Sequence, residues 1–516
     1  MPLMPAAAHL AWAVASAGAW RAFRAALQDP AAAQAAVLRR SLEGNAGTAF
    51  GRAHAFARIR TIAEFQRRVP ISTYDDLEPF VGRVAAGEDG VLTREPVRRL
   101  QPSSGSTAAA KLIPYTRGLQ REIARGVNAW IADLYRRRPG LMGGRAYWSI
   151  TPAPPARDLP RAAIPVGFDD DSRYLGGLAA TLARAVLLVP PAAGAAAFDL
   201  AGFRRTTLRT LLLARDLRLI SVWHPSFLTA LLDTLAADWD ALVDDVARRD
   251  RRRARHLRAR GPADVAGIWP RLQLVSCWAD GPSAGPAAAL AARLPGIDLQ
   301  RKGLIATEAV VSVPFSDRRP LAVRSHFFEF VAPDGRPRLA HELEPDTDYV
   351  VVVTTGGGLY RYRLGDRVRV DGVVGSTPSI TFVGRDDRVS DRFGEKLSDG
   401  FVAGVIDALF AGRTRPAFAM LAPERTADGV AYTLFVDRGA PLPAALATRV
   451  ERELRRNPHY AWCVDLGQLQ PARVAVVGAG AERAYLDACI ARGGRLGDVK
   501  PVSLDARDDW RSVLPC

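Results

Sequence analysis

Four lysines stand out in a chain that otherwise uses arginine for positive charge. Of the 70 basic residues in the 516-residue sequence, only Lys111, Lys302, Lys396 and Lys500 are lysines. A lysine carries a compact ammonium on a flexible stem and fits where the planar guanidinium of arginine does not. Lys111 ends a run rich in Ser and Gly, and Lys500 lies near the C-terminus. We therefore expect phosphate chemistry at two places far apart in the chain, with chance retention of the lysines as the alternative.

The run that ends at Lys111 has the composition of a phosphate-binding loop. Small residues let a backbone approach phosphates closely, hydroxyl and N–H groups donate hydrogen bonds to the oxygens, and a lysine neutralises charge. The spacing is not that of a Walker A loop, and a Ser/Gly run alone is often a plain linker. The candidate phosphate ligands are Ser103, Ser104, Gly105, Ser106 and Thr107, with Lys111 bracing the loop.

Three later segments could complete a nucleotide site. A carboxylate at Thr307-Glu308 could hold Mg²⁺ through oxygen ligands, although such a pair is most often a surface or capping feature. The glycines at 356–358 let the backbone pass close to a ligand or turn sharply, and Asp366 could accept hydrogen bonds from both ribose hydroxyls. The polar segment 384–388 is a candidate hinge. A hairpin turn with a charged rim remains the alternative for any one of these segments alone.

Composition limits the class of protein. The length predicts two or three domains, and 48% hydrophobic with 24% charged residues is ordinary globular usage. No apolar run is long enough for a transmembrane helix, and the apolar stretch 6–20 is expected to be an amphipathic helix rather than a signal peptide. The four cysteines and seven histidines show no disulfide or metal-ligand spacing, which indicates a reducing, cytoplasmic compartment.

A net charge of +16 raises the alternative of nucleic-acid binding. The densest basic stretch covers residues 248–260 and has the pattern of a polar helix with a solvated face. No aromatic residue interleaves with it, so stacking platforms for bases are missing. We expect no specific nucleic-acid partner and no membrane partner.

The elements that must position these residues follow from periodicity and from Gly and Pro breaks. Helices are expected over 1–70 with a break at Asp29-Pro30, and a further helix begins near 74 after a Ser or Thr cap. Strands alternate with helices and are followed by a strand-rich stretch, which predicts an α/β domain with mixed sheets. Later ranges are helices at 119–137, 226–236, 398–410 and 442–455, and strands at 147–150, 217–223, 272–278, 309–314, 327–331, 349–355, 416–422 and 431–437.

The order of the chemical motifs resembles that of the adenylate-forming superfamily. The run 103–111 is similar to its phosphate loop, Tyr362-Arg363-Leu364-Gly365-Asp366 to its ribose motif, and Gly384-Arg385-x-Asp387 with Gly394 to its hinge. Lys500 lies where the superfamily places a C-terminal catalytic lysine. Ala108 departs from this pattern, since Gly or Ser is usual there, and the segment 497–500 matches only loosely.

Within the superfamily, the sequence most resembles the GH3 family of acyl-acid amido synthetases. The supporting stretches run nearly end to end, and the length and the Arg/Ala-rich usage suggest a bacterial-type member. The resemblance implies an adenylate-forming fold, with a large α/β domain over 1–384, a hinge at 385–392 and a small mobile α+β domain over 393–516. The stretches are 45–52, 69–76, 269–281, 306–308 and 341–344.

The resemblance also implies a two-step reaction with ATP and Mg²⁺. A carboxylic acid is adenylated with release of pyrophosphate, and an amine, in this family an amino acid, then displaces AMP. Glu308 would ligate Mg²⁺, Thr307 the α-phosphate or acyl oxygen, and Lys396 or Lys500 would reach the same atoms when the small domain closes. Further assignments are Thr355, Tyr360, Asp366 and Arg385 to the nucleotide, and Trp223, Ser226, Phe227, Gly356 and Gly357 to the adenine and acyl pocket.

Two other functions stay open at this point. A CoA ligase shares the first half-reaction and uses a thiol acceptor, and a non-catalytic nucleotide- or nucleic-acid-binding protein would fit the charge and Ala108. The sequence names neither the acid nor the amine, it leaves Lys302 without a role, and a monomer is the expected state.

Overall fold

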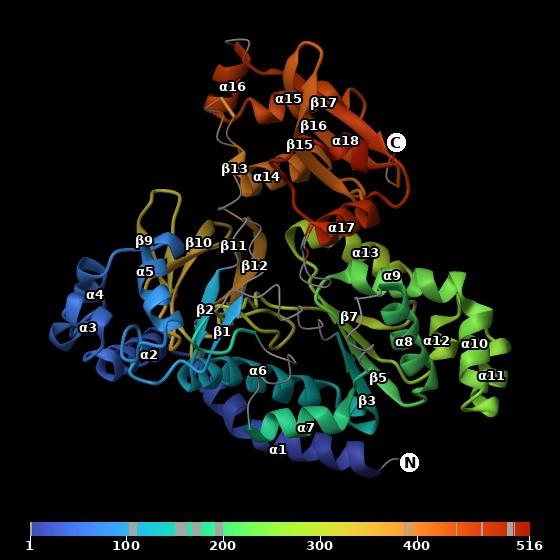
Figure 1. Cartoon of the computed structure of the whole chain (residues 1–516), viewed down its shortest axis with the longest axis horizontal. Helices are drawn as coiled ribbons and strands as arrows, with labels where there is room; N and C mark the ends of the chain where they lie inside the picture. The colour runs from blue at the N-terminus through green and yellow to red at the C-terminus, as the bar shows by residue number, and fades with distance from the viewer. Residues whose placement is uncertain are drawn as a thin grey trace.

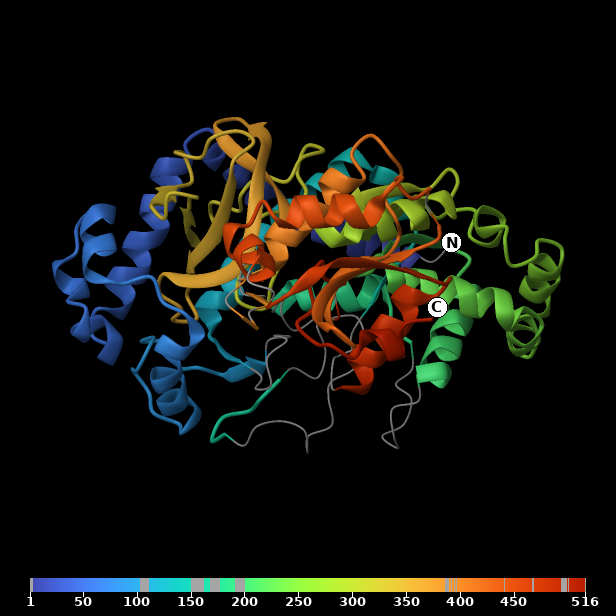
Figure 2. The same cartoon turned by 90° about the horizontal axis from the view of Figure 1, so that it is seen from above.

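The structure, a computed structural model, shows a large N-terminal domain that carries a smaller C-terminal one (Figure 1). Helices α2 to α5 lie at one end of the large domain and α10 and α11 at the other, in both views (Figures 1 and 2). No helix of the described residues is long and apolar enough to cross a membrane. The described residues are 3–102, 111–149, 162–167, 177–190, 200–385, 389–390, 392–393, 395, 397–439, 441–465, 468–492, 499 and 501–515.

The N-terminal quarter is helical, as predicted, and local capping sets its boundaries. Asp29 accepts a hydrogen bond from the N–H of Ala32 at 2.9 Å, and Pro30 occupies the first helical position of α2, which produces the expected break. Thr73 precedes α5, where Asp76 accepts from the Thr73 N–H at 2.8 Å. The helices are α1 (Leu3–Ala26), α2 (Pro30–Asn45), α3 (Ala49–Ala53), α4 (Ile62–Arg68) and α5 (Tyr74–Ala85).

One five-stranded sheet of the large domain is parallel throughout. Its order is β4-β3-β5-β6-β7, with β4 (Leu187–Leu188), β3 (Arg145–Trp148), β5 (Leu217–Ser221), β6 (Leu274–Cys277) and β7 (Asp298–Arg301). Parallel strands require long crossovers, and helices supply them here. These helices include α7 (Gly177–Val186), α8 (Leu200–Leu213), α9 (Pro225–Ala237), α10 (Trp239–Ala247), α11 (Arg251–Arg258), α12 (Val265–Ile268) and α13 (Ala284–Ala292).

The second five-stranded sheet is antiparallel throughout. Its order is β12-β11-β10-β8-β9, with β12 (Thr377–Arg385), β11 (Tyr362–Val374), β10 (Asp348–Thr354), β8 (Phe327–Val331) and β9 (Pro337–Leu339). A separate antiparallel pair joins β1 (Arg99–Pro102) to β2 (Leu112–Tyr115), so that Pro102 lies opposite Leu112. The predicted mixture of strand directions is therefore divided, in the described part of this domain, between one parallel and one antiparallel sheet.

Two sequence-based expectations need correction. The strand expected at 309–314 is only a set of isolated bridges, because the segment folds back on itself and Ser312 Oγ accepts from the Leu304 N–H at 2.9 Å. The basic stretch 248–260 is not wholly solvated, since Arg253 of α11 is buried. Its guanidinium donates to the carbonyl oxygens of Leu212 and Ile268 at 2.7 and 2.6 Å.

The C-terminal domain has its own sheet and its own cores. Strands β15 (Ala419–Thr426) and β16 (Gly429–Asp437) pair antiparallel, and β17 (Gln470–Val477) joins β16 in parallel. From Leu397 onward the buried apolar residues form two clusters separate from those of the large domain. The helices are α14 (Asp399–Leu409), α15 (Leu446–Leu454), α16 (Pro458–Asp465), α17 (Ala481–Ala491) and α18 (Trp510–Val513), and β13 (Val389–Ser390) pairs with β14 (Leu397–Ser398). The domain boundaries at 384 and 393 stay predictions.

A buried ion pair joins the helical region to the antiparallel sheet. The guanidinium of Arg361 makes two hydrogen bonds of 2.8 Å to the carboxylate of Glu329 on β8, and it also donates to the carbonyl oxygens of Gln66 and Val69 at the end of α4. Arg361 has a positive φ of 46°, and Thr354 Oγ1 accepts from its N–H at 2.9 Å. Both charged side chains are almost fully buried.

We predict that Arg361→Met lowers the free energy of unfolding by about 3–5 kcal/mol, because it leaves the Glu329 carboxylate buried without its cation. Denaturant unfolding followed by circular dichroism measures this loss. Arg338→Met is the matched control, since the 3.0 Å ion pair of Arg338 with Asp334 is exposed in the same sheet. The control should cost no more than about 1 kcal/mol. Equal losses in the two variants would contradict the prediction.

Candidate active site

Four of the predicted nucleotide-site residues, Glu308, Asp366, Arg385 and Lys111, lie near enough to one another to interact electrostatically. Asp366 on β11 lies directly opposite Arg385 on β12, with 3.3 Å between Oδ1 and Nη1. The charges of Arg385, Asp366 and Lys111 all act on the carboxylate of Glu308. Three segments that are far apart in the sequence therefore face a common site.

Glu308 is the chemically unusual member of this group. Burial raises the pKa of its carboxyl group, and Asp366 adds to this effect. A hydrogen bond from the backbone N–H of Glu308 and the cations Arg385 and Lys111 oppose it only in part. Among the described residues, no side chain donates a hydrogen bond to this carboxylate or pairs with it. A buried carboxylate without such partners is costly, and the cost falls when a cation binds. Glu308 therefore suits a metal ligand, and Thr307 beside it is half-buried.

Asp366 and Arg385 connect the site to the small domain. The guanidinium of Arg385 donates to the carbonyl oxygen of Leu364 at 3.3 Å, and its backbone N–H donates to Asp399 Oδ2 at 3.2 Å. Asp399 begins α14, and its Oδ1 accepts from the N–H groups of Ser503 and Leu504 at 2.8 Å each. One carboxylate thus links the end of β12 to the C-terminal segment that follows Lys500.

The glycine segment packs closely against neighbouring elements of the large domain. Gly356 donates from its N–H to Glu122 Oε2 at 2.7 Å, and its carbonyl accepts from Thr116 Oγ1 at 2.7 Å. A Cβ on Gly357 would lie 2.6 Å from the carbonyl oxygen of Pro114. These glycines permit close packing against the start of α6 (Arg117–Arg137). Their assignment to a substrate pocket stays a prediction.

Thr355 and Tyr360 are structural in the same way. The N–H and carbonyl of Thr355 close the turn with Leu359 and Gly358, and its hydroxyl accepts from Gly357. Tyr360 is fully buried, stacks on Phe50 at 4.8 Å between ring centroids, and donates its hydroxyl to the Leu92 carbonyl oxygen. Both side chains make contacts within the large domain. Their predicted contact with a nucleotide stays a prediction.

Several predicted residues fall outside the described part of the chain. The phosphate-loop candidates Ser103, Ser104, Gly105, Ser106 and Thr107, and the lysines Lys396 and Lys500, belong to this group. Lys111, which directly follows the loop candidates, is described and half-buried, and its Nζ lies 5.9 Å from the ring centroid of Tyr74. The roles of all of these residues stay predictions.

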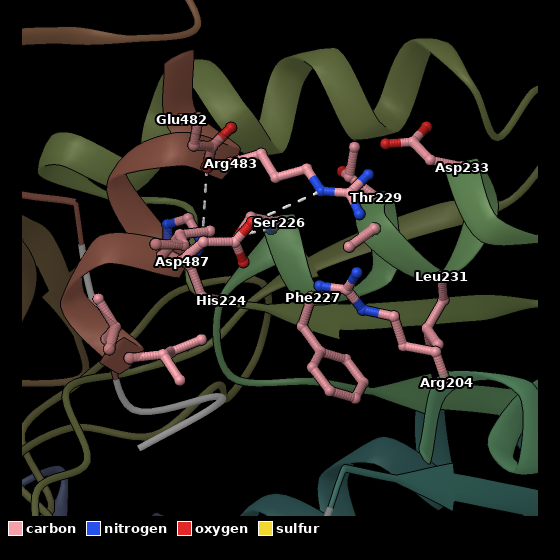
Figure 3. Close-up of a pocket in the computed structure, with 14 residues that line it drawn as sticks. Arg204, His224, Ser226, Phe227, Thr229, Leu231, Asp233, Glu482, Arg483 and Asp487 are labelled. Carbon is pink, nitrogen blue, oxygen red and sulfur yellow. Dashed lines mark hydrogen bonds and ion pairs between the residues drawn. The ribbon is translucent and has the colours of Figure 1, made fainter. Parts of the chain in front are cut away.

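A cavity of about 70 Å³ lies between the two domains, where α9 meets α17. Two predicted pocket residues, Ser226 and Phe227, line it together with Val499, the neighbour of Lys500. Figure 3 shows Glu482, Arg483 and Asp487 facing the residues of α9. Trp223 lies elsewhere, beside Lys302, with 4.4 Å from Nζ to the ring centroid.

The structure contains two polar side-chain pairs that the sequence does not predict. His224 and Glu482 meet across the domain boundary, with 3.8 Å between Nδ1 and Oε1, and His224 Nδ1 lies 2.6 Å from Ser226 Oγ. His326 donates from Nδ1 to Glu122 Oε2 at 2.9 Å and so fixes the carboxylate that holds Gly356. No sequence signal marks either pair, since the partners are hundreds of residues apart or lie on elements of opposite domains.

Glu482 provides a test of the domain contact. Burial, with a smaller contribution from Asp437, raises the pKa of Glu482 from 4.5 to about 7. Between pH 4.5 and 7 the native state thus holds a proton that the unfolded state releases. The stabilisation contributed by Glu482 is fully present below pH 4.5 and is lost as the pH rises through about 7. We expect the free energy of unfolding of the wild type to fall by about 1–3 kcal/mol across this window relative to Glu482→Gln.

The matched control is Asp487→Asn on the same helix, because the Asp487 side chain is about half exposed. It should keep the wild-type pH dependence, measured by denaturant unfolding between pH 4.5 and 7.5. A Glu482→Gln variant with an unchanged slope would show that this carboxyl group has an ordinary pKa and that the contact is solvated.

Two family models and several known proteins match this sequence. Residues 19–292 match the model of the GH3 family N-terminal domain, and residues 320–385 match the GH3 family central domain. The probable indole-3-acetic acid-amido synthetase GH3.2 of Oryza sativa subsp. japonica is 25% identical, over 91% of this chain and 87% of its own. Indole-3-acetic acid-amido synthetase GH3.8 of Oryza sativa subsp. indica is 23% identical over the same shares. These relatives are plant proteins, so the bacterial-type assignment stays a prediction.

Solved structures show the same fold. The GH3.15 acyl acid amido synthetase in complex with 2,4-DB has a TM-score of 0.81 at 18% identity, and the likeness covers 97% of this chain and 96% of that one. A 2-hydroxyisobutyryl-CoA ligase in the postadenylation state has a TM-score of 0.54 at 15% identity, over 94% and 92%. Since the N-terminal family model alone matches more than half of the sequence and the central model follows it in order, this chain belongs to the GH3 family of acyl acid amido synthetases.

Proposed function

We propose that this enzyme uses ATP to adenylate an aromatic or aliphatic carboxylic acid and passes the acyl group to the amine of an amino acid. The observation that carries this proposal is the buried Glu308 carboxylate, which shares one site with Asp366, Arg385 and Lys111. The site combines a metal-type ligand, an acceptor for ribose hydroxyls and two cations. This combination suits a nucleotide that reacts at a phosphate.

The chemistry needs charge neutralisation and alignment more than it needs a protein nucleophile. In the first step a carboxylate oxygen of the acid attacks the α-phosphorus of ATP, and the bond to pyrophosphate breaks. In the second step the amine nitrogen attacks the acyl carbon, AMP leaves, and the amine proton passes to solvent. Asp366 would accept from the ribose hydroxyls, while Arg385 and Lys111 would offset negative charge.

Mg²⁺ would be held by Glu308 and would shield the charge of the phosphates. Within the described residues, no group of three or more His, Cys, Asp or Glu could hold a metal ion. Mg²⁺ typically uses one or two carboxylates together with substrate phosphates and water, so a single carboxylate is compatible with it.

The small domain would supply the last catalytic group. Val499 lines the cavity between the domains together with Ser226 and Phe227, and Asp399 anchors Ser503 and Leu504 just beyond Lys500. These contacts support the proposal that Lys500 approaches the α-phosphate or the acyl oxygen when the domains close. Closure would also exclude water, which protects the adenylate from hydrolysis.

We predict that Glu308→Gln raises the Mg²⁺ concentration needed for half-maximal ATP–pyrophosphate exchange by about 10- to 100-fold, because the amide is a weaker ligand than the carboxylate. Exchange is measured against Mg²⁺ at saturating acid. Glu43→Gln, on the exposed face of α2, is the control and should behave as the wild type. An unchanged Mg²⁺ requirement in Glu308→Gln would remove this residue from the metal site.

Lys500→Ala should slow adenylate formation by about 10²-fold or more, with little loss of folding stability, because a cation at the reacting phosphate is lost. Single-turnover release of pyrophosphate measures this step, and thermal unfolding checks the fold. Lys396→Ala, in the same domain, is tested beside it to decide which lysine serves adenylation. Near-wild-type exchange in Lys500→Ala would remove the C-terminal assignment.

The function itself is tested by ATP–pyrophosphate exchange over a panel of aromatic and aliphatic acids. Acid-dependent exchange identifies the acyl class, and product analysis with amino acids or CoA then separates an amido synthetase from a CoA ligase. The amide product is the expected result. Absence of ATP binding and of exchange with every acid would overturn the proposal.

A further inference from the structure

Lys302 is a buried lysine that the reaction described above does not use. It follows β7 and is only 5% exposed, and its Nζ donates to the carbonyl oxygen of Val222 at 2.8 Å. The same Nζ lies 4.4 Å from the ring centroid of Trp223. In the described structure no carboxylate pairs with it. An apolar side chain would fill this space without the desolvation cost of an ammonium group.

The surroundings of Lys302 form the carboxyl edge of the parallel sheet. Trp223 follows β5, Trp278 follows β6 and Lys302 follows β7, on three adjacent strands. The Lys302 N–H donates to the Cys277 carbonyl at 2.9 Å, and the Trp278 N–H donates to the Trp223 carbonyl at 2.8 Å. In open α/β sheets, ligands bind at this edge.

The two indoles make a partly open aromatic surface beside the lysine, which contacts the Trp223 ring. Their ring centroids are 5.4 Å apart with an interplanar angle of 39°, and both side chains are half-buried. The ammonium of Lys302 contacts the Trp223 ring and the carbonyl of the residue before it. It therefore restrains both the backbone and the ring at the end of β5, since a cation over an indole is attracted by the ring.

We propose that Lys302 is a positioning residue that holds Trp223 against Trp278, and that this pair of indoles is the wall of the acid site that receives the flat or apolar part of the carboxylic acid. The second half of the proposal rests on the proposed function. An indole pair offers a broad apolar face to a ring or chain, and a fixed orientation avoids the entropic cost of ordering it at binding.

The protonation state of Lys302 makes the positioning role testable by pH. Burial lowers its pKa to about 7, so the ammonium and the neutral amine interconvert near neutral pH. The neighbouring thiol of Cys277 stays protonated, since burial raises its pKa to about 12, and Asp280 beyond it faces Arg319 and Arg301. Two further ionisable side chains in the described part of this region are His224, which follows Trp223, and Glu482, which faces His224 across the domain boundary.

The first measurement is the exciton couplet of the indole pair in the far-ultraviolet circular dichroism spectrum. The couplet amplitude that is lost in Trp223→Phe is the amplitude that comes from the Trp223–Trp278 pair. The Trp12–Trp148 pair, with ring centroids 6.3 Å apart, remains in every variant. Lys302→Met keeps the side-chain length and removes the donor and the charge. We expect Lys302→Met to lose at least half of the couplet amplitude of the Trp223–Trp278 pair. Arg271→Met, which removes an exposed cation, should keep all of this amplitude.

The second measurement separates the acid from ATP. In pyrophosphate exchange with an aromatic acid, Lys302→Met should raise the KM for the acid about tenfold and leave the KM for ATP within about twofold. An unchanged couplet overturns the proposal, and so does a reduced couplet with an unchanged KM for the acid. Lack of exchange in the wild type would contradict the proposed function instead, and the couplet would still decide the positioning role.

A pH titration covers the case in which Lys302→Met does not fold. The couplet of the otherwise native protein should change with a midpoint near pH 7, as the ammonium loses its proton and its attraction to the indole weakens. The titration is made in the Glu482→Gln background to remove the carboxyl group that titrates in the same range. A couplet that is constant from pH 6 to 8.5 would overturn the positioning role.

Discussion

The buried pair of Arg361 and Glu329 is the interaction on which the arrangement of the large domain depends. A guanidinium has five hydrogen-bond donors. That of Arg361 therefore bonds the Glu329 carboxylate of β8 and two carbonyl groups at the end of α4 at the same time. Arg361 also begins the segment that leads into β11, and Ser72 hydrogen-bonds the backbone on both sides of it. The helical region, the glycine turn and the strand that carries Asp366 are therefore fixed relative to one another by one charge pair.

From this pair, a series of contacts runs along the antiparallel sheet to Asp366 and Arg385 and then to the small domain. Asp366 faces Arg385 across the β11–β12 ladder, and Arg385 contacts Asp399 at the start of α14. The carboxylate of Asp399 also holds the backbone beyond Lys500. A movement of the small domain would thus affect both the Asp366–Arg385 pair and the backbone that Asp399 holds at Ser503 and Leu504.

Two buried charges of the large domain are each left without an ion-pair partner among the described residues. The carboxylate of Glu308 lies close to Asp366 and Arg385, and the ammonium of Lys302 lies against the Trp223 ring at the carboxyl edge of the parallel sheet. Burial favours the neutral form of each group, since it raises the pKa of Glu308 and lowers the pKa of Lys302. Perturbed groups of this kind concentrate where ligands bind, because an incoming charge or ring supplies the missing interaction. The core itself is built from neutral aromatic contacts such as Phe50 on Tyr360.

The sequence by itself determined the family, most of the helices and strands, and the breaks at Asp29-Pro30 and Thr73, because capping, periodicity and motif order are local properties of the chain. The nucleotide-site roles that it suggests for Glu308, Asp366, Arg385 and Lys111 stay predictions. The sequence did not show that Tyr360, Thr355 and the glycines at 356–357 serve packing, since their partners Phe50, Leu92, Glu122 and Pro114 come from other segments. It also left Lys302 without a role and did not reveal the His224–Glu482 contact. Only the tertiary structure decides such cases, because burial and pairing depend on which distant residues the fold brings together.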